Sequence, residues 1–180
     1  SELSKILPNH IEGDVGIAHT RWATHGGVTD ENAHPHLSQK GDIALVHNGI
    51  IDNARGLRKR LIERGFNLES ETDSEALVHM ISIGIDSGQS PLESVRQTLN
   101  RVTGTWGLCV LFKEYDMIVC ARNGSPLIIG KGEGESFISS DPHALTQHTQ
   151  SFYLLEDGDM AVVTRDGIEI SRLEGGASST

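Results

Sequence analysis

The order of apolar and polar residues divides the chain into a mixed first part and a strand-rich second part. Apolar runs at residues 15–20 and 42–47 predict two strands, and the second run is apolar enough to be buried on both faces. Apolar residues then recur at helical spacing from Ile50 and stop at Gly65. This spacing predicts a helix that begins directly after the second strand.

Two capping boxes predict two further helices. Thr72 is followed three residues later by Glu75, and Ser90 by Glu93 with Pro91 at the favoured first helical position. After these helices the pattern is typical of strands separated by turns, in seven segments: 106–113, 116–122, 127–130, 137–139, 152–155, 159–164 and 167–172. Two stacked sheets between helical layers fit this order of elements.

Composition and charge narrow the class of protein. The chain has 180 residues and a formal net charge of −10. This charge argues against a nucleic-acid partner, because a protein that binds the phosphate backbone needs clustered Lys and Arg. No apolar run approaches the roughly 18 residues that span a bilayer. We therefore expect a cytoplasmic protein with one domain over residues 1–174 and a linker or tail at 175–180.

The segment His19–Gly26, with the sequence HTRWATHG, has the highest density of side chains that could bind a substrate or take part in catalysis. A free amino acid requires a forked cation for its carboxylate, which Arg21 offers, and Thr24 and His25 add donors nearby. Its ammonium group requires an anion such as Asp73, at a predicted helix start. Capping of that helix is the alternative interpretation of Asp73 and is favoured on the residue alone.

Asn48-Gly49 allows two interpretations. An Asn side-chain amide and a Gly backbone N–H can together stabilise the oxyanion of a tetrahedral intermediate. The same dipeptide is also the strongest signal for a two-residue hairpin turn. A helical pattern, and not a returning strand, follows Gly49, so the hairpin is the less natural choice.

The motifs together resemble those of one family. His19–Gly26, Asn32–His36, His47–Ile51 and Ser70–Asp73 occur in the order found in the glutaminase domain of glucosamine-6-phosphate synthases, the glutamine–fructose-6-phosphate amidotransferases. Later motifs at 122–130, 139–141 and 155–159 extend the resemblance over most of the chain. The resemblance implies an α+β fold, the αββα four-layer sandwich of N-terminal nucleophile (Ntn) hydrolases, here expected to lack its N-terminal strand or strands and helix.

The resemblance also implies residue roles. Arg21, Thr24 and His25 would hold the glutamine carboxylate, and Asp73 its ammonium group. Trp22 would close over the substrate and gate ammonia transfer, and Asn48 and Gly49 would form the oxyanion hole. The implied partners are L-glutamine and a sugar-phosphate isomerase or synthase domain of the same polypeptide, through which the family forms homodimers. No cofactor and no metal are implied.

The family nucleophile, a cysteine at the mature N-terminus, has no counterpart near Ser1, which opens a polar segment unlike a buried strand. We therefore expect this chain alone to be inactive. Cys109 and Cys120 are in apolar strand patterns where thiols are inert; a turn at Glu114-Tyr115 would place them opposite each other. A fragment that at most binds glutamine, and an amidotransferase with another acceptor, are the alternative functions.

Five of the nine histidines fall between His19 and His47. His34-Pro35-His36 suggests a metal site, but the proline does not aim both rings at one point, and zinc requires three or four ligands. Hydrogen-bonded structural histidines around a polar pocket are the preferred interpretation.

Overall fold

The structure, a computed structural model, describes residues 13–21 and 26–175. Three α-helices, a short 3-10 helix and nine strands are assigned in these residues. Their bounds are β1 (His36–Leu37), β2 (Ile43–Ile51), α2 (Ala54–Glu63), α3 (Ser74–Asp86), α4 (Pro91–Leu99), β3 (Gly104–Phe112), β4 (Met117–Asn123), β5 (Ile128–Lys131), β6 (Ser136–Ser139), η1 (Pro142–Ala144), β7 (Ser151–Leu154), β8 (Asp159–Val163) and β9 (Ile168–Arg172). The seven strands expected after residue 105 are thus confirmed, with shifts of one to a few residues at their ends.

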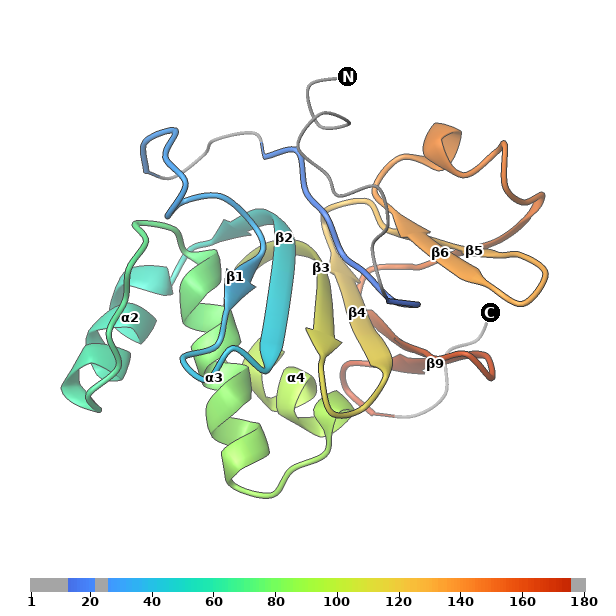
Figure 1. Cartoon of the computed structure of the whole chain (residues 1–180). Helices are drawn as coiled ribbons and strands as arrows, with labels where there is room; N and C mark the ends of the chain where they lie inside the picture. The colour runs from blue at the N-terminus through green and yellow to red at the C-terminus, as the bar shows by residue number, and fades with distance from the viewer. Residues whose placement is uncertain (1–12, 22–25, 176–180) are drawn as a thin grey trace.

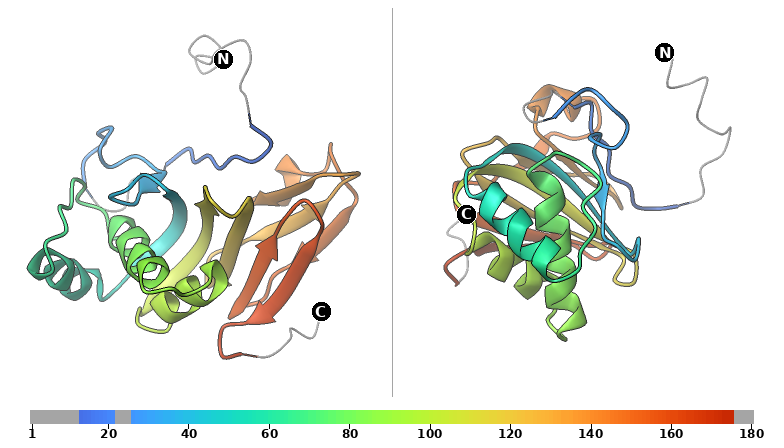
Figure 2. Two further views of the ribbon diagram at one scale, coloured as in Figure 1. Left: turned by 60° about the horizontal axis from the view of Figure 1, so that its bottom comes forward. Right: turned by 90° about the vertical axis from the view of Figure 1, so that its left-hand side faces the viewer.

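A six-stranded antiparallel sheet forms the centre of the fold, in the order β1-β2-β3-β4-β8-β9 (Figure 1). Its middle strands are nearly continuous apolar runs because both of their faces are covered. Helices α3 and α4 pack against each other and against β2 and β4, and Figure 2 shows the helices gathered on one side of this sheet.

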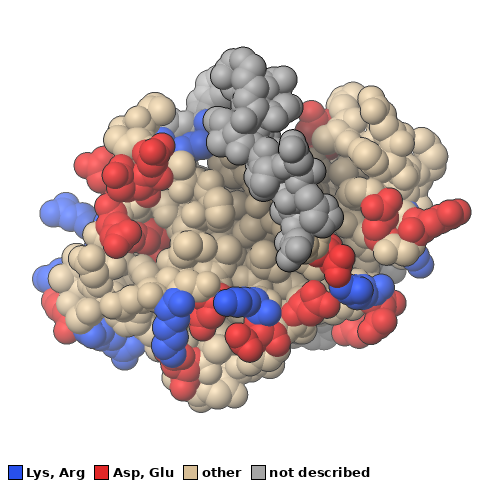
Figure 3. All heavy atoms as spheres, in the orientation of Figure 1, with Lys and Arg blue, Asp and Glu red and all other residues tan. Residues whose placement is uncertain are grey.

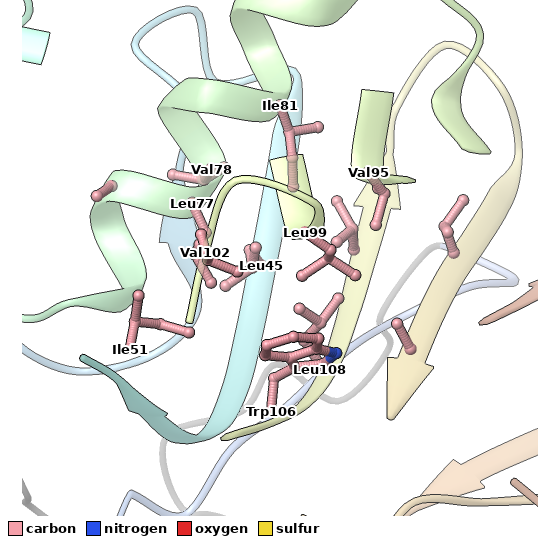
Figure 4. Packing of buried hydrophobic residues seen from close by; sticks show 14 of the residues in the cluster. Leu45, Ile51, Leu77, Val78, Ile81, Val95, Leu99, Val102, Trp106 and Leu108 are labelled. Carbon is pink, nitrogen blue, oxygen red and sulfur yellow. The ribbon is translucent and has the colours of Figure 1, made fainter. Parts of the chain in front are cut away.

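The larger hydrophobic core lies between these helices and the central sheet. Leu77, Val78 and Ile81 of α3 lie on the helix face that meets Leu45 of β2 and Leu108 of β3 (Figure 4). All five are at most 1% exposed. Burial of such side chains contributes about 1.5–3 kcal/mol each, so this layer holds β2, and the polar residues at its end, in place.

A three-stranded sheet, β6-β5-β7, covers the other face of the central sheet. Ile129 of β5 and Leu127 before it join Cys109, Cys120 and Val46 in a second buried cluster. The three described helices have their main contacts with one another and with the central sheet, and not with this smaller sheet. The described residues therefore form a helical layer and two stacked sheets, which confirms the α+β class.

Two sequence predictions near the site were wrong. The segment 15–20 is not a strand, because the described residues provide no partner strand beside it; Val15 and Ile17 instead pack on the second cluster. The predicted helix does not begin at Ile50. Residues 48–51 remain in β2 because they pair with 104–107 of β3, and the helix begins only at Ala54.

Other local predictions were met. The side chain of Ser90 caps α4 by accepting a hydrogen bond from the N–H of Glu93. Cys109 lies opposite Cys120 in the β3–β4 pairing, as the turn at Glu114-Tyr115 requires. The short strand β1 was missed, because two residues are too few to show a period of two.

The surface and the ends complete the description. On the face shown in Figure 3, Lys and Arg side chains alternate with Asp and Glu along the lower rim and do not gather into one basic patch. None of the helices in the described residues is long and apolar enough to cross a membrane. Of the predicted linker at 175–180, residues 176–180 lie outside the described residues.

Candidate active site

The carboxyl-terminal end of β2 presents backbone N–H groups away from β3. The N–H of His47 donates to His34 Nδ1 at 3.2 Å, and the N–H of Ile51 donates to Asp73 Oδ2 at 2.7 Å. Since every second N–H of a strand points to the same edge, the N–H of Gly49, between them, lies at this edge too. The hairpin interpretation of Asn48-Gly49 is therefore wrong: both residues are inside a strand.

Gly49 occupies a position that only glycine fits. Its φ is +133°, and a Cβ atom there would lie 2.2 Å from the carbonyl oxygen of Thr105 and 3.1 Å from His47 Nε2. Contacts this short would push β2 away from β3.

Asn48 is held by the first segment of the chain. Its Oδ1 lies 2.6 Å from His19 Nε2, and His19 Nδ1 accepts a hydrogen bond of 2.8 Å from the backbone N–H of Arg21. The segment 13–21 crosses the face of the central sheet (Figure 1). One imidazole thus connects the predicted carboxylate clamp with the predicted oxyanion donor, although the two lie 27 residues apart in sequence.

Arg21 has an unusual backbone and a fixed side chain. Its φ of +42° lies in the left-handed region, which costs free energy in a residue with a Cβ. Its Nη1 donates to the carbonyl oxygen of Gly27 at 2.9 Å. A strained conformation held by bonds on both sides is typical of functional loops, and it fixes the guanidinium near the end of β2.

Glu71 and Asn32 join this segment to the start of α3. The Glu71 carboxylate accepts hydrogen bonds from the N–H of Gly27 at 3.2 Å and from Asn32 Nδ2 at 3.4 Å. Asn32 Oδ1 accepts in turn from the N–H of Glu71 at 2.8 Å. Both residues belong to motifs noted in the sequence, but no pattern assigned them this linking role.

Asp73 occupies the N-cap position of α3, as the capping interpretation expects, but its side chain makes no capping hydrogen bond. One carboxylate oxygen accepts from the N–H of Ile51, and the other from the Ser74 hydroxyl at 3.2 Å. The side chain is 5% exposed and borders an open hollow of about 620 Å³ that is also lined by Asp52, Arg55 and Arg58. Asp73 thus places a carboxylate beside the N–H of Ile51, which is two residues after Gly49 in β2.

His34 and His36 pack near the site and are hydrogen-bonded. The ring of His34 lies 4.4 Å from that of His19 and 4.8 Å from that of His36. Burial, helped by the positive charges that neighbouring histidines and Arg21 would carry, lowers the pKa of His34 to about 3. His36 is hydrogen-bonded to Thr72, and its pKa is also lowered, mainly by burial. The expected hydrogen-bonded histidines are confirmed.

Glu75 anchors the loop that carries Asp73. Burial alone would raise the pKa of its carboxyl group, but His79, the Ser70 hydroxyl and the N–H groups of Glu69 and Ser70 all point to it. Together they hold this pKa at about 2. In the predicted capping box, Thr72 accepts from the N–H of Glu75, but the Glu75 carboxylate turns to Ser70 instead of returning to Thr72.

The remaining predicted residues divide into two groups. Trp22, Thr24 and His25 lie outside the described residues. Cys109 and Cys120 are buried and unbonded to each other, and burial raises the pKa of the Cys109 thiol to about 12 and that of Cys120 well above its ordinary value. Neither thiol is ionised at neutral pH, so neither is a nucleophile.

Comparison with known proteins follows the same motifs. A family model described as a glutamine amidotransferase domain matches residues 19–147. The glutamine–fructose-6-phosphate aminotransferase (isomerizing) of Zymomonas mobilis is 47% identical over 96% of this chain, and that of Chlorobaculum tepidum is 53% identical over 89%. The chain spans 28% and 26% of these two relatives' lengths.

A solved structure supports the fold. The glutamine phosphoribosylpyrophosphate (PRPP) amidotransferase of B. subtilis superposes on 88% of this chain with a TM-score of 0.71 and 25% identity, over 35% of its own length. The predicted fold class, that of Ntn-hydrolase class II amidotransferases, is therefore confirmed. Because the family match spans most of its length, the chain belongs to the glutamine amidotransferase domain family.

Proposed function

We propose that this chain is the glutamine-hydrolysing domain of an enzyme that converts fructose-6-phosphate to glucosamine-6-phosphate. The observation that carries the proposal is the arrangement around the end of β2: His19 links the Arg21 backbone to Asn48, and Asp73 accepts from the N–H of Ile51, two residues after Gly49. The acceptor follows from the printed names of the relatives. This reaction requires no cofactor or metal.

The two ends of glutamine have different partners in this proposal. The Arg21 guanidinium, with Thr24 and His25, binds the α-carboxylate by forked hydrogen bonds. The Asp73 carboxylate binds the α-ammonium. Its burial strengthens that attraction, since the interaction is less screened than at the surface. Trp22 covers the bound substrate and controls the passage of ammonia.

The reacting carboxamide lies at Asn48 and Gly49. A thiolate attacks its carbon, a C–S bond forms, and the oxygen becomes negatively charged. The Asn48 Nδ2 and the Gly49 N–H stabilise that charge. The C–N bond then breaks, ammonia leaves after gaining a proton, and water hydrolyses the thioester to glutamate. We assign the thiol to a cysteine outside these 180 residues, because Cys109 and Cys120 are buried and un-ionised.

The wider assembly is also part of the proposal. The ammonia passes to a sugar-phosphate isomerase or synthase domain of the same polypeptide, and the complete cytoplasmic enzyme pairs as a homodimer through that domain. Residues 1–174 form the glutaminase domain and 175–180 the start of the connection. Light scattering of the complete polypeptide measures its mass in solution, and a monomer would contradict the dimer.

The test is ammonia release from glutamine by the complete polypeptide, with and without fructose-6-phosphate. We expect glucosamine-6-phosphate as the product and no reaction when PRPP is the acceptor. Asn48→Ala should lower kcat about a hundredfold, the typical effect of losing one oxyanion donor. Asn100→Ala, at the end of α4, is the matched control and should keep kcat.

Each alternative has its own outcome. If glutamine is hydrolysed and its ammonia is transferred to another acceptor, the proposed glutaminase activity would stand and fructose-6-phosphate would be the wrong acceptor. Calorimetric binding of glutamine without any hydrolysis would support a domain that only binds it. An effect of Asn48→Ala on KM alone would remove this residue from the oxyanion hole.

A further inference from the structure

The imidazole of His19 lies between two groups that the proposed function uses, yet no role follows for it from the motifs. Its Nε2 is 2.6 Å from Asn48 Oδ1, and its Nδ1 is 2.8 Å from the backbone nitrogen of Arg21. The ring is half-buried and lies against His34. A ring held at both nitrogens has only one arrangement of protons that satisfies its neighbours.

That arrangement follows from donor and acceptor chemistry. A backbone N–H can only donate, so His19 Nδ1 must be the unprotonated acceptor of the Arg21 N–H. In a neutral imidazole the proton then lies on Nε2, which must donate. Its partner on Asn48 must therefore be the amide oxygen, because the opposite orientation of the amide would bring two donors to 2.6 Å.

The orientation of the Asn48 amide decides which of its atoms the substrate meets. With Oδ1 bound to His19, the Nδ2 group turns away from the imidazole and is available to donate to a developing oxyanion. The reversed amide would present an oxygen lone pair, which would repel the same charge. The His19 proton thus selects the productive orientation.

We infer that His19 is a positioning residue that orients the Asn48 amide for the oxyanion and couples it to the Arg21 backbone. This inference rests on the proposed glutaminase function. His34 packs against this ring: the two ring centroids lie 4.4 Å apart with the planes tilted by 31°, and His34 Nδ1 accepts from the N–H of His47 on β2. Burial lowers the pKa of His34, so this ring places no positive charge beside the His19–Asn48 pair at neutral pH.

Two substitutions by amide side chains test the two hydrogen bonds of His19 one at a time. In His19→Asn the side-chain oxygen reaches the place of Nδ1 and retains the bond to Arg21, but the donor to Asn48 is lost. In His19→Gln the amide nitrogen reaches the place of Nε2 and retains the donor to Asn48, but the acceptor for Arg21 is lost. We expect His19→Asn to lower kcat about tenfold or more with little change in KM, as for a misoriented oxyanion donor. His19→Gln should mainly raise KM.

A double-mutant cycle tests whether His19 acts through Asn48. When Asn48→Ala is already present, adding His19→Asn should lower kcat less than twofold further, because there is no amide left to orient. Equal and independent losses in both backgrounds would overturn the inference, as would a loss confined to the melting temperature.

A second measurement does not depend on activity. Nitrogen-15 NMR of the His19 ring reports which nitrogen carries the proton, and we expect it on Nε2, with a coupling across the hydrogen bond to the amide carbon of carbon-13-labelled Asn48. A proton on Nδ1 would overturn the inference even in a protein that hydrolyses glutamine. An Nε2 proton in a protein without glutaminase activity would retain the orientation of Asn48 and refute the proposed function instead.

Discussion

At the scale of single residues, the site depends on atoms whose position leaves little choice of side chain. Gly49 has no room for a Cβ because the Thr105 carbonyl lies against it, and the Asn48 amide oxygen lies 2.6 Å from His19 Nε2. Sequence patterns predicted both residues as an oxyanion pair. They did not predict His19 as a partner, because the contact crosses 29 positions of the chain.

Gly49→Ala should be destabilising. The new methyl group would meet the Thr105 carbonyl at 2.2 Å with φ at +133°, so we expect a loss of about 3 kcal/mol in the free energy of unfolding from strain and overpacking. Gly56→Ala in α2 is the matched control, since no atom lies within 4 Å of its Cβ position. Urea denaturation measures both, and equal stabilities would contradict the proposed crowding.

Arg21→Lys tests the carboxylate clamp. An ammonium group is a point donor and cannot hold the Gly27 carbonyl and both oxygens of a carboxylate in fixed geometry. We expect KM for glutamine to rise about tenfold, or about 1.4 kcal/mol, with kcat little changed. Steady-state kinetics of the complete polypeptide provides both values. Arg64→Lys, exposed just after α2 and away from the hollow beside Asp73, is the control, and an unchanged KM in Arg21→Lys would refute the clamp.

At the scale of elements, β2 organises the site because its end is paired on one side and open on the other. Its N–H groups at His47 and Ile51 are taken by His34 and Asp73, so these side chains mark the edge where Gly49 lies. The sequence predicted the apolar core of β2. The sequence could not predict that β2 extends through Ile51, because the spacing of apolar residues from Ile50 onward is equally compatible with a helix. Pairing with β3 keeps these residues in the strand.

The histidines beside β2 should make the fold sensitive to mild acid. Folding lowers the pKa of His34 from 6.5 to about 3, so below pH 6.5 the unfolded chain binds a proton that the folded chain does not. Stability is therefore complete above pH 6.5 and decreases as the pH falls toward 3. We expect the melting temperature to fall between pH 7 and pH 5. The pKa of Glu75 is 4.5 in the unfolded chain and about 2 in the folded one, so protonation of Glu75 adds to the loss of stability only at lower pH.

A substitution identifies the group responsible. His34→Asn keeps an acceptor for the His47 N–H but does not titrate, so it should reduce the change in melting temperature between pH 7 and pH 5. His143→Asn removes an exposed imidazole and should leave this change as it is in the unmodified protein. If His34→Asn and the unmodified protein lose the same number of degrees, another group causes the acid sensitivity.

At the scale of the whole molecule, the two stacked sheets enclose the thiols. Cys109 and Cys120 face each other across β3 and β4, under Leu127 and Ile129 of the smaller sheet layer. Neither should react with a thiol reagent in the folded protein, because burial keeps both protonated and inaccessible. Cys109 and Cys120 should release no thionitrobenzoate from Ellman's reagent until denaturant is added; rapid labelling of one of them in the native protein would contradict this packing.

The sequence by itself determined the elements and the kind of chemistry. Periodicity and capping boxes identified α3, α4 and the strands after residue 105, and the motifs around Arg21, Asn48 and Asp73 indicated a family whose match is confirmed. Such signals are local, since they depend on the spacing of residues along one segment.

Only the tertiary structure decided how these parts meet. It showed that the Asp73 side chain binds the N–H of Ile51 and makes no capping hydrogen bond to its helix, that Glu71 and Asn32 link two loops, and that His19 lies within hydrogen-bond distance of Asn48. Each of these contacts joins residues more than 20 positions apart. Their partners are selected by the packing of β2 against α3 and of the first segment over the sheet, and no local pattern contains that information.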